Sequence, residues 1–210
     1  MEQFTDTYEK LIKENNRWLE EFKKSNIMQL ITSVKMDNVH TRTQLLDGVQ
    51  ILSNYFQKIM LLRVVLIEDE KFSTLAQEHL NEEFGHNHLL SEERNHRVPK
   101  WDSILDATSA WFTWKMFTLN NIEKTFIVHF VLEGSAQIFF TTANETMQKY
   151  NQMKYLTIHA ENDEKHEKMG RELLENLRVE EYTSLASIQK QAWKMMITVC
   201  DRIAFLAESI

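Results

Sequence analysis

A chain of 210 residues with one proline and four glycines has few residues suited to tight turns, which disfavours an all-β or α/β domain. Its apolar content of 43% and charged content of 26% are those of an ordinary globular protein. The formal net charge of −7, without a cluster of basic residues, excludes nucleic acid as an expected partner. We therefore expect one all-α domain spanning residues 1–210.

The apolar pattern predicts about seven helices. A first helix begins at Thr5 or Asp6 and runs to about Lys24, and a short apolar element follows over residues 27–34. The segment 94–100, which contains the only proline, is the clearest break in the chain. A loop near residues 179–184 precedes a last helix that ends at Phe205. Further long helices are expected over residues 43–63, 71–93, 104–119, 122–150 and 156–177.

Three features predict where the protein acts in the cell. The first ten residues lack the charged-then-apolar pattern of a signal peptide. The most apolar runs, residues 59–67 and 127–132, are too short to span a bilayer. Cys200 is the only cysteine, so no disulfide framework exists. These features predict a soluble, cytoplasmic protein with no membrane partner.

The helix expected over residues 156–177 carries polar side chains on the face that should be buried. Steps of three and four residues place His159, Asp163 and His166 on one stripe, between Leu156 and Leu177. Burying a carboxylate and two imidazoles is costly, and a bound cation offsets that cost. The pattern therefore predicts a metal site, and the alternative is a solvated helix on which the spacing arises by chance.

The helix expected over residues 71–93 repeats this spacing with His79, Glu83 and His86. Glu-x-x-His on an inward helix face is the arrangement found in di-iron carboxylate bundles, so Glu83 and His86 are candidate ligands. His79 is a further ligand or a residue that supports one. A histidine-rich surface patch is the alternative, and His79, Glu82 or His88 could replace Glu83 or His86 as a ligand.

Glu133 lies in the apolar segment FIVHFVLEGSAQIFF, residues 126–140, where His129 is the only other ionisable residue. A carboxylate in such a segment must be paired, protonated or bound to a metal. We interpret Glu133 as a ligand and His129 as a supporting or alternative ligand. A protonated glutamate in the core, or one at a subunit contact, remains the alternative.

Three carboxylates and three histidines form a ligand set that suits iron or manganese. Structural zinc sites favour thiolates, and calcium sites favour oxygen ligands alone. Two cations held by few carboxylates also leave coordination positions open for dioxygen. The spacing of the residues does not separate iron from manganese.

This ligand set resembles that of the haem-oxygenase-like di-iron oxidases and oxygenases. In that family one core helix carries a Glu and a His, the next carries a lone Glu, and a third carries His-x3-Asp-x2-His. Residues 39–62 are also similar to the early helix of the wider superfamily, which includes TenA-like proteins, through His40, Gly48, Tyr55 and Gln57. The resemblance covers residues 28–170. It assigns the ligand roles to Glu83, His86, Glu133, His159, Asp163 and His166.

One position departs from the family pattern. In many relatives a longer interval separates the first Glu from the His, so the pairing of Glu83 with His86 is the least secure transfer. The resemblance implies a haem-oxygenase-like helical bundle with two iron ions as cofactor and dioxygen as co-substrate. The implied reaction is oxidation of a small metabolite, such as an amino acid or a fatty acid, with an electron donor and a homodimer as further expectations.

The rival hypothesis is a metal-free, TenA-like protein that binds or hydrolyses a small molecule. TenA-like thiaminases use a cysteine nucleophile in the middle of the chain, and Cys200 lies too close to the C-terminus for that role. A helical interaction protein that merely retains the fold is the third interpretation.

Overall fold

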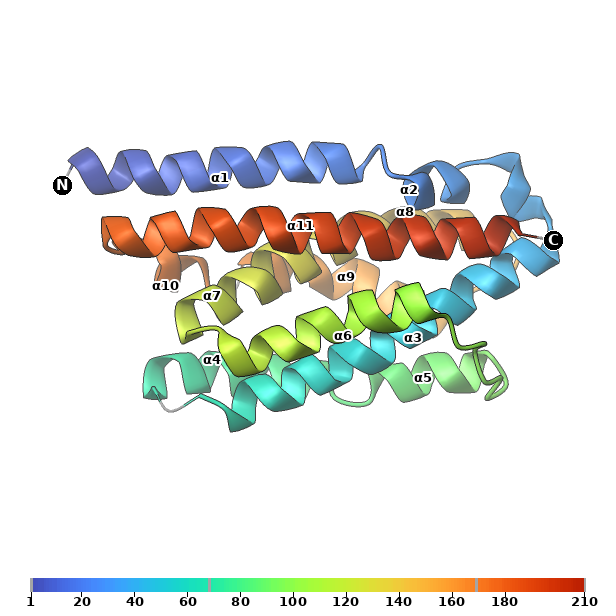
Figure 1. Ribbon diagram of the computed structural model, residues 1–210. Coiled ribbons are helices and arrows are strands. Elements are labelled where there is room, and N and C mark those ends of the chain that lie inside the picture. Colours follow the sequence, from blue (N-terminus) through green and yellow to red (C-terminus); the bar gives the residue numbers. More distant parts are fainter. Residues whose placement is uncertain (1, 68, 169, 210) are drawn as a thin grey trace.

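Long helices that run side by side form the computed structural model of the chain (Figure 1). The structure describes residues 2–67, 69–168 and 170–209, without the side chains of residues 2–6 and 162–168. Among these residues seven helices have at least fourteen residues, as expected, and no strand is present. The elements are α1 (Glu2–Phe22), α2 (Asn26–Ile31), a 3-10 turn (Val34–Asp37), α3 (Val39–Val65), α4 (Glu70–Glu83), α5 (His86–Glu93), α6 (Ser103–Thr118), α7 (Asn121–Phe126), the π-helical segment η2 (Ile127–Leu132), α8 (Glu133–Met147), α9 (Lys154–Lys168), α10 (Arg171–Leu174) and α11 (Val179–Glu208).

The helix α11 is the longest described helix and runs the length of the molecule beside α1 (Figure 1). Its Trp193 is fully buried, and the indole Nε1–H donates a hydrogen bond to Asn15 Oδ1 of α1 at 2.8 Å. This bond satisfies the one polar group of a large apolar side chain, which lets the side chain fill the core without an unpaired donor. On its other sides α11 packs against α3 and α6.

Two predicted helices are each divided by a glycine. The helix expected over residues 71–93 breaks between α4 and α5, where Gly85 has φ +89°. The helix expected over residues 156–177 ends before Gly170, which has φ +77°, and only the four-residue α10 follows. A left-handed backbone cannot continue a right-handed helix, so the predictions of continuous helices were wrong.

The loop predicted near residues 179–184 was also wrong, because α11 begins at Val179. The backbone N–H of Arg178 donates a hydrogen bond to the Glu181 carboxylate at 2.8 Å. A glutamate three residues after the cap satisfies a donor that a helix start leaves unpaired, so this segment starts a helix.

One helical stretch, Asn121–Met147, is long and apolar enough to cross a membrane by length and composition alone. Within the molecule, 72% of its most apolar window is buried against other helices. Its apolar character is therefore that of a core helix.

Candidate metal centre

Glu83, His86 and His159 meet inside the bundle. His86 Nδ1 lies 3.1 Å from Glu83 Oε2, and His159 Nε2 lies 3.6 Å from the same oxygen. The three potential ligand atoms all lie within 4.8 Å of one another. Glu83 and His159 are buried, and His86 is partly exposed. One carboxylate oxygen and two imidazole nitrogens at these distances can bind a single divalent cation.

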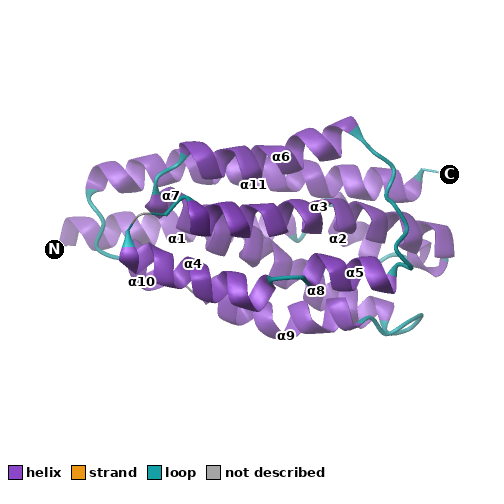
Figure 2. Ribbon diagram, turned by 90° about the horizontal axis from the view of Figure 1, so that it is seen from below, coloured by secondary structure: helices purple, strands orange, loops and turns teal. Residues whose placement is uncertain are grey.

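The break between α4 and α5 forms one side of this cluster. Glu83 is the last residue of α4 and His86 the first of α5, so the two side chains meet across the turn at Gly85. The Gly85 backbone N–H donates a hydrogen bond to Gln57 Oε1 of α3 at 2.7 Å, which fixes the turn. Figure 2 shows α4 and α5 end to end along one side of the molecule, next to α3 and α9.

The other side of the cluster is the first half of α9. The Glu93 carboxylate, at the end of α5, accepts hydrogen bonds from the backbone N–H groups of Lys154 (2.6 Å) and Tyr155 (3.1 Å). It thereby caps the start of α9, so the helix that carries His86 also fixes the helix that carries His159.

The protonation of the His159 ring is set by its backbone contact. Its Nδ1 lies 2.8 Å from the carbonyl oxygen of Tyr155, which can only accept a hydrogen bond. The proton of the neutral ring is therefore on Nδ1, and the lone pair of Nε2 points toward Glu83. This is the arrangement that metal-binding histidines use, with one nitrogen on a backbone carbonyl and the other on the metal.

Glu83 carries a negative charge in this environment. Burial opposes ionisation of the carboxyl. When His159 and His86 are protonated, however, their hydrogen bonds and charges outweigh burial and hold the pKa of Glu83 below its ordinary value. An ionised carboxylate beside two imidazoles is a favourable ligand set for iron or manganese.

A second buried cluster contains Arg63, His79, His129 and Glu133. His79 Nε2 lies 2.9 Å from Glu133 Oε1, and Arg63 Nη1 lies 2.9 Å from His129 Nε2 and 3.4 Å from His79 Nδ1. The two histidine rings stack with their centroids 4.9 Å apart. All four side chains are almost completely buried. His79 lies between the Glu133 carboxylate and the Arg63 guanidinium and contacts both.

A guanidinium can only donate hydrogen bonds, which fixes the roles of both rings. His129 Nε2 and His79 Nδ1 accept from Arg63, so in the neutral His79 ring the proton lies on Nε2, facing Glu133. Burial lowers the pKa of Arg63 to about 10, and the charge of Glu133 partly offsets this effect, so Arg63 is cationic at neutral pH.

The π-helical segment η2 precedes Glu133 directly and contains His129. A π-helical turn has more residues than an α-helical turn, so it changes the direction in which the following side chains point. Here both ionisable residues of an otherwise apolar segment point into the same buried cluster. Short π-helical segments within α-helices occur frequently at functional sites.

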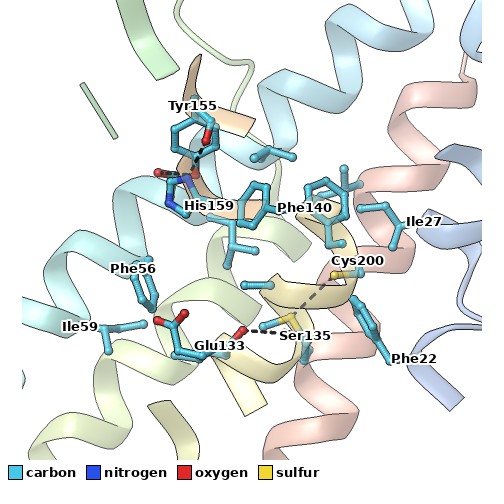
Figure 3. Close-up of a pocket in the computed structure, with 18 of the residues that line it drawn as sticks. Phe22, Ile27, Phe56, Ile59, Glu133, Ser135, Phe140, Tyr155, His159 and Cys200 are labelled. Atoms are coloured by element: carbon cyan, nitrogen blue, oxygen red, sulfur yellow. Dashed lines mark hydrogen bonds between the residues drawn. The ribbon is translucent and has the colours of Figure 1, made fainter. Parts of the chain in front are cut away.

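Both clusters border one apolar cavity of about 80 Å³, to which Glu83, Glu133 and His159 contribute their side chains. Figure 3 shows Glu133 beside Phe56 and Ile59, with His159 beside Tyr155 at another wall. The remaining walls are mostly apolar and include Phe22, Ile27, Leu132, Phe139, Phe140, Met196, Cys200 and Ile203. A water molecule needs about 10–15 Å³, so the cavity accommodates a small apolar group or several waters.

The structure therefore brings together three of the six predicted ligands, Glu83, His86 and His159. Glu133 borders the same cavity but lies against His79. The side chains of Asp163 and His166 lie outside the described residues. The alternatives Glu82 and His88 are exposed, in contrast to the buried Glu83. His79 and His129 lie behind Glu133, so their geometry favours a supporting role over direct coordination.

The sequence reasoning missed Arg63. It lies in the apolar segment IMLLRVVLI, residues 59–67, and is fully buried. Like Glu133, Arg63 is a single charge within an apolar segment, so the same pattern predicts that both side chains are buried.

Comparisons with known proteins identify relatives of the whole chain. The chain is 34% identical over 194 residues to the uncharacterized protein RP592 of Rickettsia prowazekii (strain Madrid E), covering 92% of this chain and 93% of that protein. No family model matches the chain.

Solved structures show the same fold. A TenA homologue from Pyrococcus furiosus superimposes with a TM-score of 0.72 at 13% identity, covering 94% of this chain and 99% of that chain. A domain of unknown function with a haem oxygenase-like fold from Shewanella denitrificans gives a TM-score of 0.69 at 16% identity, covering 92% and 90%. The fold is therefore the all-α haem-oxygenase-like fold that the TenA homologue shares.

Proposed function

Because the chain belongs to the same family as the Rickettsia prowazekii protein and has the haem-oxygenase-like fold, we propose that it is a non-haem iron oxidase or oxygenase. In this proposal the enzyme uses dioxygen to oxidise a small substrate. The observation that carries the proposal is the convergence of Glu83, His86 and His159 at the edge of an apolar cavity. A buried carboxylate with two oriented imidazoles is costly to maintain without a cation.

The donor set of the described residues fits a divalent metal. Glu83, His86 and His159 would hold one ion, and Glu133, Asp163 and His166 are the further ligands that the resemblance implies for a pair of ions. When bound, ferrous ions would supply the redox chemistry for dioxygen activation, with manganese as the alternative metal.

The residues of the chain have separate roles in this proposal. Tyr155 holds the His159 ring in the tautomer that leaves Nε2 available. The apolar walls formed by Phe56, Phe139 and Phe140 exclude water and receive the apolar part of the substrate. We further expect an electron donor, a homodimer and a cytoplasmic location.

The proposal predicts iron binding that depends on His159. After anaerobic reconstitution with ferrous ion and removal of free metal, wild-type protein should retain about two iron ions per chain. His159→Ala removes one imidazole of the described cluster and should lose most of that iron. Metal analysis by mass spectrometry measures both.

Glu161→Ala is the matched control, since Glu161 is exposed on the same helix and should retain the wild-type iron content. Iron content in His159→Ala equal to that of wild type would refute the ligand assignment. Absence of iron above background in the wild type would reject the metalloenzyme as a whole.

The metal-free, TenA-like alternative is disfavoured by Cys200. The thiol borders the cavity, but complete burial raises its pKa far above neutrality. A protonated, buried thiol is a poor nucleophile, so hydrolysis through Cys200 is not supported.

A further inference from the structure

The helix α6 carries large apolar side chains on its outer side. Ile104, Trp111, Trp114 and Phe117 follow one another at intervals of seven, three and three residues, so they form one stripe along the helix. Trp114, in the middle of this stripe, is 62% exposed, and Phe117 is 56% exposed. Their ring centroids lie 6.2 Å apart, so the two side chains form one continuous apolar surface.

The composition of α6 is not that of a helix with one side in water. The surface helix α1 has nine charged residues among 21, whereas α6 has two among 16, Asp106 and Lys115. Asp106 accepts a hydrogen bond from the Tyr55 hydroxyl, and Lys115 Nζ lies 5.1 Å from the ring centroid of Trp111. A helix that is apolar on all sides is normally buried on all sides, so the outer side of α6 is suited to a further contact.

The neighbouring helix α3 extends the apolar surface. The two helices run side by side in the same direction, and the hydrogen bond between Tyr55 and Asp106 sets their register (Figure 1). Leu61 and Val65 lie further along α3, level with the second half of α6, and both are exposed, Val65 to 77%. We define the α6 face as the surface formed by Ile104, Trp111, Trp114 and Phe117 of α6 with Leu61 and Val65 of α3.

The area of the α6 face is large enough for the centre of a stable interface. From the exposed fractions of its side chains we estimate roughly 600 Å², the upper end of what the largest patch on a monomer usually reaches. Each partner in a stable interface contributes about 800 Å², in which an apolar centre is surrounded by a polar rim. The face therefore supplies most of the surface that a dimer requires.

Charge favours a second copy of this chain as the partner. The net charge of −7 makes two copies repel each other wherever their acidic surfaces meet. The one carboxylate of α6, Asp106, is already paired with Tyr55, so two copies can approach along the α6 face without this repulsion. A partner with charged side chains would have to bury them against aromatic rings, which is costly. An identical apolar face carries no such cost.

We propose that the α6 face is the interface of a homodimer. In this dimer α6 of one copy packs against α6 of the other across a two-fold axis that passes near Trp114, so that each copy contributes the same surface. The inference goes beyond the proposed function, because it assigns a surface to the expected homodimer and uses none of the candidate metal ligands.

The test is analytical ultracentrifugation of the wild-type protein and of charge variants over a range of concentrations. Wild type should sediment with twice the mass of one chain. Trp114→Glu should weaken self-association by roughly a hundredfold or more, because it replaces a central aromatic anchor with a charge that meets its own copy. Val65→Glu should weaken it in the same direction from α3. Both side chains are exposed, so circular dichroism should show folded variants.

Phe84→Glu is the matched control. Phe84 is an equally exposed aromatic residue, at 67%, and lies between α4 and α5. These helices and α6 lie on opposite sides of α3 (Figure 2). The control variant should remain dimeric, because its new charge lies outside the proposed interface.

A mixing experiment tests the two-fold arrangement. Trp114→Lys alone should also be monomeric, since two lysines would meet at the axis. An equimolar mixture of Trp114→Lys and Trp114→Glu should form dimers, because opposite charges then face each other across the interface. A mixture that stays monomeric would overturn the two-fold arrangement.

The remaining outcomes are equally decisive. A monomeric wild type would overturn the inference and leave the iron-binding proposal intact. Folded Trp114→Glu and Val65→Glu variants that dimerise as tightly as wild type would place the interface elsewhere and contradict the inference. If Trp114→Glu does not fold, Val65→Glu and Phe84→Glu decide, because equal dimerisation of these two variants contradicts the proposed surface.

Discussion

Buried carboxylates in this molecule differ in the partners that neutralise them. Asp47 lies against two arginines, Arg94 and Arg97. Glu133 lies against His79, with Arg63 behind it. Glu83 lies against His86 and His159. A histidine carries a charge only when protonated, so these two partners do not supply the permanent positive charge that an arginine gives to Asp47.

The hydroxyl of Tyr55 on α3 donates a short hydrogen bond to the Asp106 carboxylate on α6. This bond, together with burial, raises the pKa of Tyr55 to about 12 from an ordinary value of 10.0. Below pH 10 the tyrosine keeps its proton in both states. Above pH 10 the unfolded chain loses the proton first, so the free energy of unfolding should fall as the pH rises toward 12.

Urea denaturation at several pH values between about 8 and 12 measures this effect. The loss should amount to about 1–2 kcal/mol, after allowance for solvent screening of a partly exposed group. Tyr55→Phe is the control and should lose less stability over the same range, because it lacks the titrating hydroxyl. Parallel curves for the two proteins would contradict the assignment.

At the level of residues, the sequence predicted the ionisable side chains that the bundle buries but not all their partners. His79, Glu83, Glu133 and His159 are buried as expected, because each lies on an apolar stripe or in an apolar segment. The contact between Glu133 and His79 joins residues 54 positions apart. Helical spacing within one segment carries no information about which stripes face each other, so this pairing required the structure.

Two glycines divide helices of this fold, and their surroundings differ. A Cβ atom at Gly85 would meet no atom within 4 Å, whereas one at Gly170 would lie 2.9 Å from Thr125 Cγ2 and 3.2 Å from His129 Cδ2. Both residues have positive φ. The turn at Gly170 therefore packs tightly against the helix that carries His129.

This difference predicts unequal effects of alanine. Gly85→Ala should lower the free energy of unfolding by about 1–2 kcal/mol, the cost of a left-handed backbone for a residue with a side chain. Gly170→Ala should cost about 2–5 kcal/mol, because steric overlap adds to the same strain. Chemical denaturation of the two variants provides the comparison, and each serves as the control for the other. Equal losses would argue against tight packing at Gly170.

At the level of elements, the sequence predicted the long helices but not their interruptions. The apolar stripe of residues 72–90 continues through Gly85, so periodicity alone cannot reveal the turn. The contact between Glu83 and His86 survives because the turn brings the end of α4 close to the start of α5. The sequence analysis also placed the start of α11 too late. The residues at this start have weak apolar periodicity, and the helix start is indicated instead by the Glu181 carboxylate, which accepts a hydrogen bond from the Arg178 backbone N–H.

At the level of the whole molecule, the low glycine and proline content correctly indicated an all-helical domain. The haem-oxygenase-like fold follows from the superposition on solved structures. In this fold residues of α3, α4, α8, α9 and α11 line one cavity, so Glu83, Glu133 and His159 from distant segments border a common space. The fold supplies the enclosed space, and the identities of the side chains determine what it binds.

The central claim is that Glu83, His86 and His159 hold a metal ion. The most direct measurement is anomalous X-ray diffraction from crystals grown after anaerobic loading with ferrous ion, recorded above and below the iron absorption edge. We predict an anomalous peak within bonding distance of Glu83 Oε2, His86 Nδ1 and His159 Nε2. Crystals that contain iron but show no peak between these three side chains would contradict the account.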